Sequence, residues 1–550
     1  MSSKASLVAL LCAAAAVPAM AQIVGVPLAT LIEQGNHKAA LARIRAGADV
    51  NAAQPDGTRP IHWAVEKLDY AVLDALIARK AKVDVTNEFG STPLGEAAKL
   101  GDARMVKALL DAGARPDIPN QDGETPLMLA VKTGELPVVK LLVDAGANVN
   151  ARETFHNQTA LMWAAAAPKN GGEIVKLLLS KGADEKPRAL YSDWDSQITS
   201  EPRAQYRPTG GLTAFLYAAR DGCYDCVDAL LAAGADINRP TPEGVTPLML
   251  ALDNNHNEVA KLLLDRGANA NLWDWWGRTA LYIAIDRREN VIAPLRSGLV
   301  AIDVAYRQEA PPEHAPGLPP VSNLDIIHKL VDAGVDLEAQ LNMHRPSRRG
   351  NIGRFVEEFY NTGCTPLMRA TISGDMEVVR ILLDKGASPN TGAMGLTPFL
   401  IAAGVGTGGR GSGLASSTHS GGPADIPLMD LLLEHGADIN ARVTGEKTYS
   451  LRISRAPSST EGMTALHVAA QKGRAEEVRY LLSKGAKADL LDAGGHKPLD
   501  LVGAPVESAA NRSNVALAPA SASGRSGLED GSSAAIAEIR TLLGSTASSK

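Results

Sequence analysis

"TPLMLAVKTGELPVVKLLVDAGANVN", residues 125–150, is the stretch that decides the fold, and it holds two short apolar segments, each followed by a glycine. Thr125 precedes Pro126, which is typical of a helix start: the hydroxyl accepts a backbone N–H, and proline at the first helical position has no N–H to leave unpaired. Leucine and valine at helical spacing supply a buried stripe, and Gly146 offers a left-handed helix stop. The stretch therefore predicts two short amphipathic helices joined by a turn.

The same pattern recurs along the chain with a base period of 33 residues. Copies of the first-helix phrase begin at Arg59, Thr92, Thr125, Thr159, Thr213, Thr246, Thr279, Thr365, Thr397, Thr464 and Lys497. Longer steps between copies are one period plus an insertion. A half-repeat at residues 27–51 aligns with the same pattern and is predicted to cap the N-terminal end.

The repeated unit resembles the ankyrin repeat, whose signature includes Thr-Pro-Leu-His-x-Ala at this period. The resemblance covers residues 22–502. It implies an all-α repeat solenoid of about 12 stacked helix-turn-helix units including caps, with short β-hairpin fingers and several loop insertions. It also implies protein binding through the fingers and the surface of the first helices.

Insertions interrupt the repeat at five places. Those expected on the finger edge are residues 185–210, 339–362 and 441–460, and those expected between the two helices of a unit are residues 288–323 and 404–425. Residues 503–534 are rich in Ser, Ala and Gly and are predicted to be a low-complexity linker. Residues 535–545 are predicted to supply a C-terminal capping helix.

The N-terminus has the pattern of a secretory signal peptide, predicted at residues 1–21. Lys4 precedes an apolar run at residues 7–17, and small residues flank a cleavage site after Ala21. The run is too short to span a membrane, so we expect an exported protein without a transmembrane segment, either periplasmic or secreted. A net charge of −6 argues against a dedicated nucleic-acid binder.

Patterns of catalytic chemistry are missing from the sequence. There is no His-Glu-x-x-His helix, no phosphate loop ending in Gly-Lys-Ser/Thr and no nucleophile elbow after a strand. We therefore expect no metal site, no cofactor and no small-molecule substrate. The sequence predicts a non-enzymatic scaffold that binds a protein partner, whose identity it does not encode.

Cys223 and Cys226 form a Cys-x-x-Cys pair at an expected turn between helices. A local disulfide or a structural role is favoured over redox catalysis, because no strand precedes the pair. The alternative function is an exported enzyme or thiol-redox factor that uses this pair or a site built by the insertions.

Three of the six tryptophans lie in "NLWDWWGRTAL", residues 271–281. Aligned on the repeat, Trp273, Trp275 and Trp276 occupy a fingertip, where three exposed indoles would form an unusually large apolar patch. Two explanations remain open: the insertion at residues 339–362 covers them, or a partner binds them. We expect at least one ring to pack internally and the remaining surface to bind. The predicted partner-binding residues are Trp273, Trp275, Trp276, Arg345, Arg348, Arg349 and Arg354.

Overall fold

The computed structural model describes residues 26–192, 209–297, 317–341, 363–393, 395–405, 424–444, 460–503 and 533–547. Within these ranges the chain folds mainly into short paired helices, which confirms the predicted helical repeat architecture. The described residues divide into two compact units, unit 1 at residues 26–192 and 209–242 and unit 2 from Glu243 onward. The predicted signal peptide lies outside the described residues.

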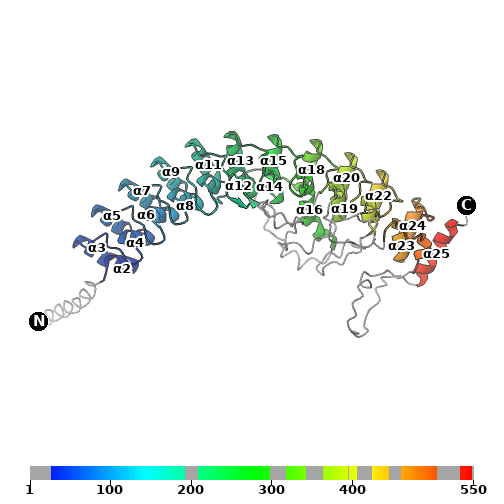
Figure 1. Ribbon diagram of the computed structural model, residues 1–550, viewed down its shortest axis with the longest axis horizontal. Coiled ribbons are helices and arrows are strands. Elements are labelled where there is room, and N and C mark those ends of the chain that lie inside the picture. Colours follow the sequence, from blue (N-terminus) through cyan, green and yellow to red (C-terminus); the bar gives the residue numbers. More distant parts are fainter. Residues whose placement is uncertain are drawn as a thin grey trace, which may run out of the picture. The chain divides into compact units, whose positions relative to one another are not determined.

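Unit 1 is a stack of helix pairs in chain order, with the first helices in one row and the second helices in another (Figure 1). The pairs are α2 (Leu28–Glu33) with α3 (His37–Arg45), α4 (Pro60–Glu66) with α5 (Tyr70–Ala78), α6 (Pro93–Lys99) with α7 (Ala103–Asp111), α8 (Pro126–Thr133) with α9 (Leu136–Asp144), α10 (Ala160–Ala165) with α11 (Gly171–Ser180), and α12 (Ala214–Asp221) with α13 (Tyr224–Ala232). Strands β1 (Tyr191–Ser192) and β2 (Thr209–Gly210) form an antiparallel pair.

The repeated residues act locally as the sequence predicts. The Thr125 hydroxyl accepts the N–H of Met128 at 3.4 Å, and Pro126 occupies the first helical turn of α8. Gly134 and Gly146 end the two helices with φ values of 70° and 87°, which only glycine adopts without strain. Leu142 is fully buried between the helices, so each pair is held by its apolar stripe.

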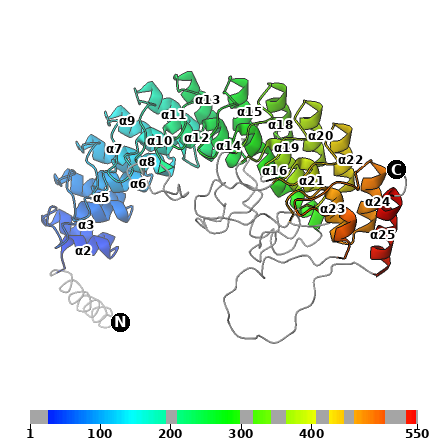
Figure 2. The same cartoon turned by 45° about the vertical axis from the view of Figure 1, so that its right-hand side comes forward.

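Unit 2 continues the same pattern. Its elements are α14 (Pro247–Asp253) with α15 (Asn257–Asp265), α16 (Ala280–Ser297) with α18 (Asn323–Asp332), α19 (Pro366–Ser373) with α20 (Met376–Asp384), α21 (Pro398–Ala402) with α22 (Ile426–Glu434), α23 (Ala465–Gln471) with α24 (Ala475–Ser483), and the 3₁₀ helix η4 (Pro498–Leu501) with α25 (Ser533–Ala547). Figure 2 shows α25 beside α24 at the end of this unit.

The insertion predicted at residues 288–323 begins within α16, which continues to Ser297. Most other first helices are followed by a residue with left-handed φ, such as Gly222 or Asn255. Arg288 occupies the corresponding position of α16, so the helix lacks its usual stop.

Backbone hydrogen bonds join the two ends of each of the three finger-edge insertions. The backbone N–H of Ala189 donates to the carbonyl of Leu212, that of Leu341 to the carbonyl of Cys364, and that of Val443 to the carbonyl of Met463. Each insertion therefore extends from a closed base. The central parts of all five predicted insertions, and most of residues 503–534, lie outside the described residues.

Helix α25 is two residues longer at each end than the predicted capping helix, residues 535–545. Ile539 and Leu543 are buried, and the helix contacts α24 and η4. Arg479 of α24 forms an ion pair with Glu538. The helix thus covers the apolar end of the last described repeat.

Candidate interaction surface

The fingers between repeats are tight turns held by one polar side chain. In the finger at residues 120–124, the Asn120 side-chain oxygen accepts the N–H of Asp122 at 3.0 Å and that of Glu124 at 2.9 Å. Gly123 takes a φ of 78°. Because the Asn120 amide oxygen accepts these backbone N–H groups, it fixes the conformation of the turn. The side chains at the tip of the finger point outward and are free to vary.

Neighbouring fingers are joined by backbone hydrogen bonds. In unit 1, the backbone carbonyl of Asp56 accepts the N–H of Glu88 at 2.8 Å, that of Asp122 accepts the N–H of Thr154 at 2.9 Å, and that of His156 accepts the N–H of Leu190 at 2.6 Å. In unit 2, the carbonyl of Glu243 accepts the N–H of Trp275 at 2.8 Å. These bonds fix the spacing of the fingertips within each unit, so side chains on adjacent fingers form one pre-organised surface.

Exposed large apolar side chains concentrate on the fingers. Among the described residues those on fingers are Phe89, Phe155, Leu190, Tyr191, Trp273, Trp275 and Leu491. The other two, Leu68 and Leu100, lie at turns between the two helices of a pair. An apolar side chain at so many fingertips makes the finger edge the candidate binding surface.

A second set of side chains lies beside the fingers, four residues after each first-helix cap; we call it the first-helix row. In unit 1 its members are partly exposed, and they are Trp63, Glu96, Leu129, Trp163 and Tyr217. In unit 2 Leu250 is also partly exposed, whereas the later members Ile283, Arg369, Ile401 and Val468 are buried. The accessible part of the row therefore lies mainly in unit 1.

Two rings of the row are fixed by one glutamine. The indole N–H of Trp163 donates to Gln158 Oε1 at 2.8 Å, and the Gln158 amide donates to the Tyr217 hydroxyl oxygen at 2.5 Å. Phe155 and Leu190 lie on the two fingers that join these repeats and are 63% and 62% exposed. Tyr191, which follows Leu190, is 46% exposed. We call these side chains of neighbouring fingers and first helices the aromatic cluster, defined as Phe155, Trp163, Leu190, Tyr191 and Tyr217.

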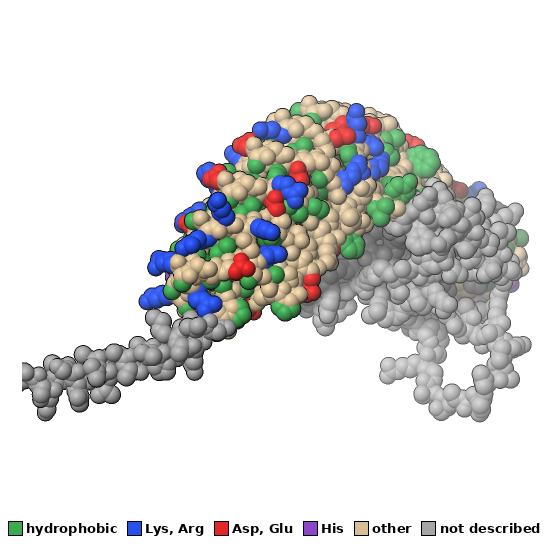
Figure 3. Space-filling view, turned by 60° about the vertical axis from the view of Figure 1, so that its left-hand side comes forward, with side chains coloured by type: hydrophobic (Ala, Val, Ile, Leu, Met, Phe, Trp, Pro, Cys, Tyr) green, Lys and Arg blue, Asp and Glu red, His purple; other side chains and the backbone are tan. Residues whose placement is uncertain are grey.

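Cations accompany this aromatic cluster. Lys132 Nζ lies 5.4 Å from the centre of the Trp163 ring, and Arg220 lies 4.7 Å from that of Tyr217. A hydrogen bond with Asp221 raises the pKa of Arg220. Arg152 and His156 are exposed on the adjoining finger. Figure 3, by contrast, shows Lys and Arg interspersed with Asp and Glu over the wider face of unit 1 that it presents.

The tryptophan finger of unit 2, which carries Trp273, Trp275 and Trp276, has one buried ring and two exposed rings. Trp276 is only 4% exposed, whereas Trp273 and Trp275 are 64% and 37% exposed. The expectation that at least one ring packs internally is therefore confirmed. The predicted rim residues Arg345, Arg348, Arg349 and Arg354 lie outside the described residues, so the two explanations for the exposed rings remain predictions.

A buried ion-pair network supports this finger, and its role was not foreseen from sequence. Arg278 Nε lies 2.7 Å from Asp274 Oδ2, and an Arg278 terminal nitrogen lies 3.0 Å from Asp253 Oδ2. Burial alone would lower the pKa of Arg278, but the two carboxylates outweigh it and raise the pKa. The guanidinium also lies 5.2 Å from the centre of the Trp276 ring. The network holds the finger in place and leaves Trp273 and Trp275 on its outer side.

Cys223 and Cys226 are joined as a disulfide, which lies at the turn between α12 and α13. Cys364 is buried at 2% exposed. No group of three or more His, Cys, Asp and Glu side chains in the described ranges is arranged to hold a metal ion. None of the helices in those ranges combines the length and apolarity needed to cross a bilayer.

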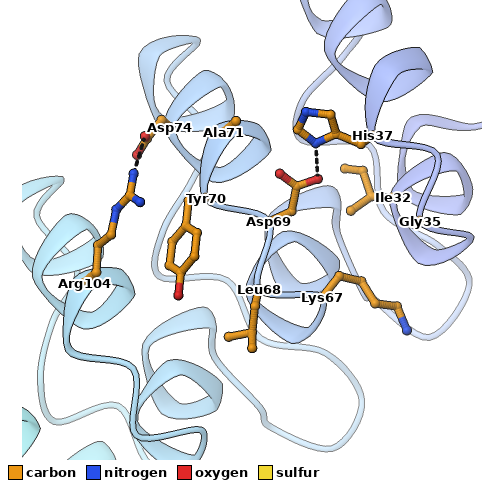
Figure 4. Close-up of a pocket in the computed structure, with 10 residues that line it drawn as sticks. All are labelled: Ile32, Gly35, His37, Lys67, Leu68, Asp69, Tyr70, Ala71, Asp74 and Arg104. Atoms are coloured by element: carbon orange, nitrogen blue, oxygen red, sulfur yellow. Dashed lines mark hydrogen bonds and ion pairs between the residues drawn. The ribbon is translucent and has the colours of Figure 1, made fainter.

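A shallow hollow of about 500 Å³ lies at the turns between helices near the start of unit 1 (Figure 4). His37 Nδ1 lies 2.7 Å from Asp69 Oδ2, and Arg104 lies 3.5 Å from Asp74. These charged groups pair with one another across the wall of the hollow. The hollow is therefore a weaker candidate site than the finger edge, where apolar rings face solvent.

Leu68, on the wall of this hollow, has a φ of 53°, in the left-handed region that neighbouring repeats fill with glycine. We expect Leu68→Gly to stabilise unit 1 by roughly 0.5–1 kcal/mol, because removing left-handed strain outweighs the added freedom of the unfolded chain. Leu100 is equally exposed but has a φ of −76°, so Leu100→Gly should destabilise by a similar amount. Urea unfolding of both variants checks the opposite signs, and destabilisation by Leu68→Gly would show that Leu68 is not strained.

Known proteins match parts of the chain. One segment of 136 residues is 34% identical to part of "Ankyrin repeat and KH domain-containing protein mask" of Drosophila melanogaster and covers 24% of this chain and 3% of that protein. Another of 180 residues is 24% identical to part of "Alpha-latrocrustotoxin-Lt1a" of Latrodectus tredecimguttatus and covers 33% of this chain and 9% of that protein. The chain thus spans a small fraction of either relative's length.

Models of one repeat family match much of the chain. A model described as "Ankyrin repeats (3 copies)" matches residues 28–120, 94–189 and 215–303. "Ankyrin repeats (many copies)" matches residues 456–502, and "Ankyrin repeat" matches residues 362–392. Such repeats are generally non-enzymatic modules for protein–protein interaction. These matches agree with the helix pairs, caps and fingers described above, and the chain belongs to the ankyrin repeat family.

Proposed function

We propose that this chain is an exported, non-enzymatic scaffold that binds a protein partner through the aromatic cluster of unit 1. The observation that carries the proposal is the distribution of exposed large apolar side chains, which lie on the fingers at every described position except Leu68 and Leu100. Export is supported by the signal-peptide pattern at residues 1–21. The acidic net charge favours a protein over a nucleic acid as the partner.

The aromatic cluster has the features of an interface centre. Tyr and Trp contribute large contact areas at a small entropic cost, and Gln158 already holds Trp163 and Tyr217 in place. Lys132 and Arg220 add positive charge at the rim. We therefore expect the partner to present apolar side chains flanked by acidic residues.

Replacing Phe155 and Tyr191 together with Ala should weaken partner binding about tenfold or more, because both side chains are exposed and their loss leaves the core intact. A suitable measurement is affinity capture from the envelope or medium of the producing cell, followed by titration of the captured partner. Leu100→Ala is the matched control, since Leu100 is exposed but lies at a turn between helices. Equal affinity of the double variant and the control would contradict the proposed site.

The tryptophan finger offers a second surface, which the same titration separates from the first. Trp273→Ala with Trp275→Ala removes the two exposed rings while leaving the buried Trp276 and Arg278 in place. Weaker binding by this variant, with unchanged unfolding, would extend the interface to unit 2. Unchanged affinity would restrict it to unit 1.

A further inference from the structure

The Cys223–Cys226 disulfide occupies a position that other repeats give to a helix-capping side chain. Cys223 is the N-cap of α13, and its Sγ accepts the backbone N–H of Cys226 at 3.3 Å. The corresponding residues Asp102 and Asp375 accept the equivalent N–H through a carboxylate oxygen. The Sγ atom of Cys223 therefore occupies the N-cap position at which the repeats of Asp102 and Asp375 place a negatively charged carboxylate.

The N-terminus of a second helix also meets the disulfide. Gly171 is the first residue of α11, and a Cβ at that position would lie 3.3 Å from Cys226 Sγ and 3.6 Å from Cys223 Sγ. Gly172 likewise leaves room for Asp225. The absence of side chains at both glycines brings the positive end of α11 against the sulfurs, so two helix N-termini act on one disulfide.

The two sulfurs differ in access. Cys223 is partly exposed, whereas Cys226 is fully buried. Because Cys223 is the more exposed of the two residues, it is the one that an incoming thiolate attacks in this arrangement, and Cys226 is the leaving group. This arrangement combines an accessible sulfur, a shielded sulfur and a local field that favours thiolate.

Building on the partner binding proposed above, we propose that Cys223 and Cys226 form a thiol–disulfide exchange site that accepts electrons, once per chain and without catalytic turnover, from thiols of a protein bound to unit 1. In the first step a partner thiolate attacks Cys223 Sγ, the bond between Cys223 and Cys226 breaks, and Cys226 leaves as a thiolate that takes a proton from water. In the second step another thiolate of the partner attacks the partner's sulfur in the mixed disulfide and releases Cys223. The partner is oxidised from dithiol to disulfide, and the Cys223–Cys226 pair is reduced to two thiols.

The sequence favours a structural disulfide over redox catalysis, because no strand precedes the pair. The structure adds the α11 N-terminus and the difference in access, neither of which local sequence shows. A structural disulfide predicts slow exchange, since folding would shield it. An exchange site predicts that folding accelerates the reaction.

Glutathione is the probe that separates these outcomes. We expect reduced glutathione to reduce the disulfide of the folded full chain about tenfold faster than that of an oxidised synthetic peptide of residues 221–228, because the two helix N-termini stabilise the departing thiolate. Alkylation and intact-mass measurement at successive times give both rates. A rate in the folded chain equal to or below that of the peptide would overturn the proposal.

Single-cysteine variants test which sulfur is attacked. With oxidised glutathione as the probe, Cys226→Ser should form a mixed disulfide at Cys223 and release one equivalent of reduced glutathione, whereas Cys223→Ser should form little, because Cys226 is buried. Cys364→Ser, which changes a buried residue of unit 2, should leave the exchange rate unchanged. Equal labelling of the two single variants, with helix content preserved in circular dichroism, would contradict the assignment. The rate comparison with the peptide uses the unmodified chain and holds even where a variant fails to fold.

Discussion

Replacing Asp286 with Ala is expected to lower the stability of the repeats around α16 and α19 by about 3–5 kcal/mol, the usual effect of removing one partner of a buried ion pair. Asp286 Oδ1 lies 2.8 Å from Arg369 Nε, and the side chains are 3% and 0% exposed. The variant removes a carboxylate that balances a buried guanidinium. Amide hydrogen exchange of α16 and α19 measures the local free energy of opening.

The matched control is Asp111→Ala in unit 1. Asp111 pairs with Lys107 at 2.9 Å on an exposed helix face, and such pairs contribute about 0.3–0.5 kcal/mol. The paired replacement of Asp286 with Leu and Arg369 with Met should recover most of the loss, because it removes both charges together. A loss from Asp286→Ala no larger than that of the control would mean that Arg369 does not depend on this carboxylate.

The repeat itself could be predicted from local chemistry. A threonine cap, a following proline and a glycine stop act within a few residues, and Thr125, Pro126 and Gly134 behave as the sequence indicates. The same reasoning explains why α16 does not end near Arg288, since this position lacks the glycine or asparagine that follows most other first helices. The predicted insertion boundary did not take this into account. Local rules therefore explain helix starts and ends wherever the repeat is regular.

Burial of individual side chains could not be predicted in this way. Phe155 and Trp276 occupy the same position of their fingers, yet they are 63% and 4% exposed. Arg369 occupies a first-helix position that is partly exposed throughout unit 1, yet it is fully buried. Arg369 pairs with Asp286, which lies 83 residues earlier, and a 33-residue period does not contain such a contact. Phe155 follows Gly146 at the same spacing at which Trp276 follows Gly267, so the repeat register alone could have added Phe155 to the candidate site.

Gly123→Ala should destabilise unit 1 by about 2–4 kcal/mol, because a side chain there is strained and also collides with the next finger. The φ of Gly123 is 78°, and an added Cβ would lie 2.9 Å from both Thr154 N and Thr154 Cγ2. The N–H of Thr154 donates to Asp122 at 2.9 Å, so relief of the clash displaces this link between fingers. Urea unfolding of the variant measures the loss.

Gly113→Ala isolates the contribution of the contact. Gly113 has a φ of 90° but open space where a Cβ would stand, so we expect only the strain of about 1 kcal/mol. Because Phe155 follows Thr154 directly, Gly123→Ala should also weaken binding of the captured partner, whereas Gly113→Ala should leave the affinity unchanged. Equal losses of stability in the two variants would show that the finger contact contributes nothing. Reduced stability with full affinity would show that the bond between Asp122 and Thr154 does not position Phe155 for binding.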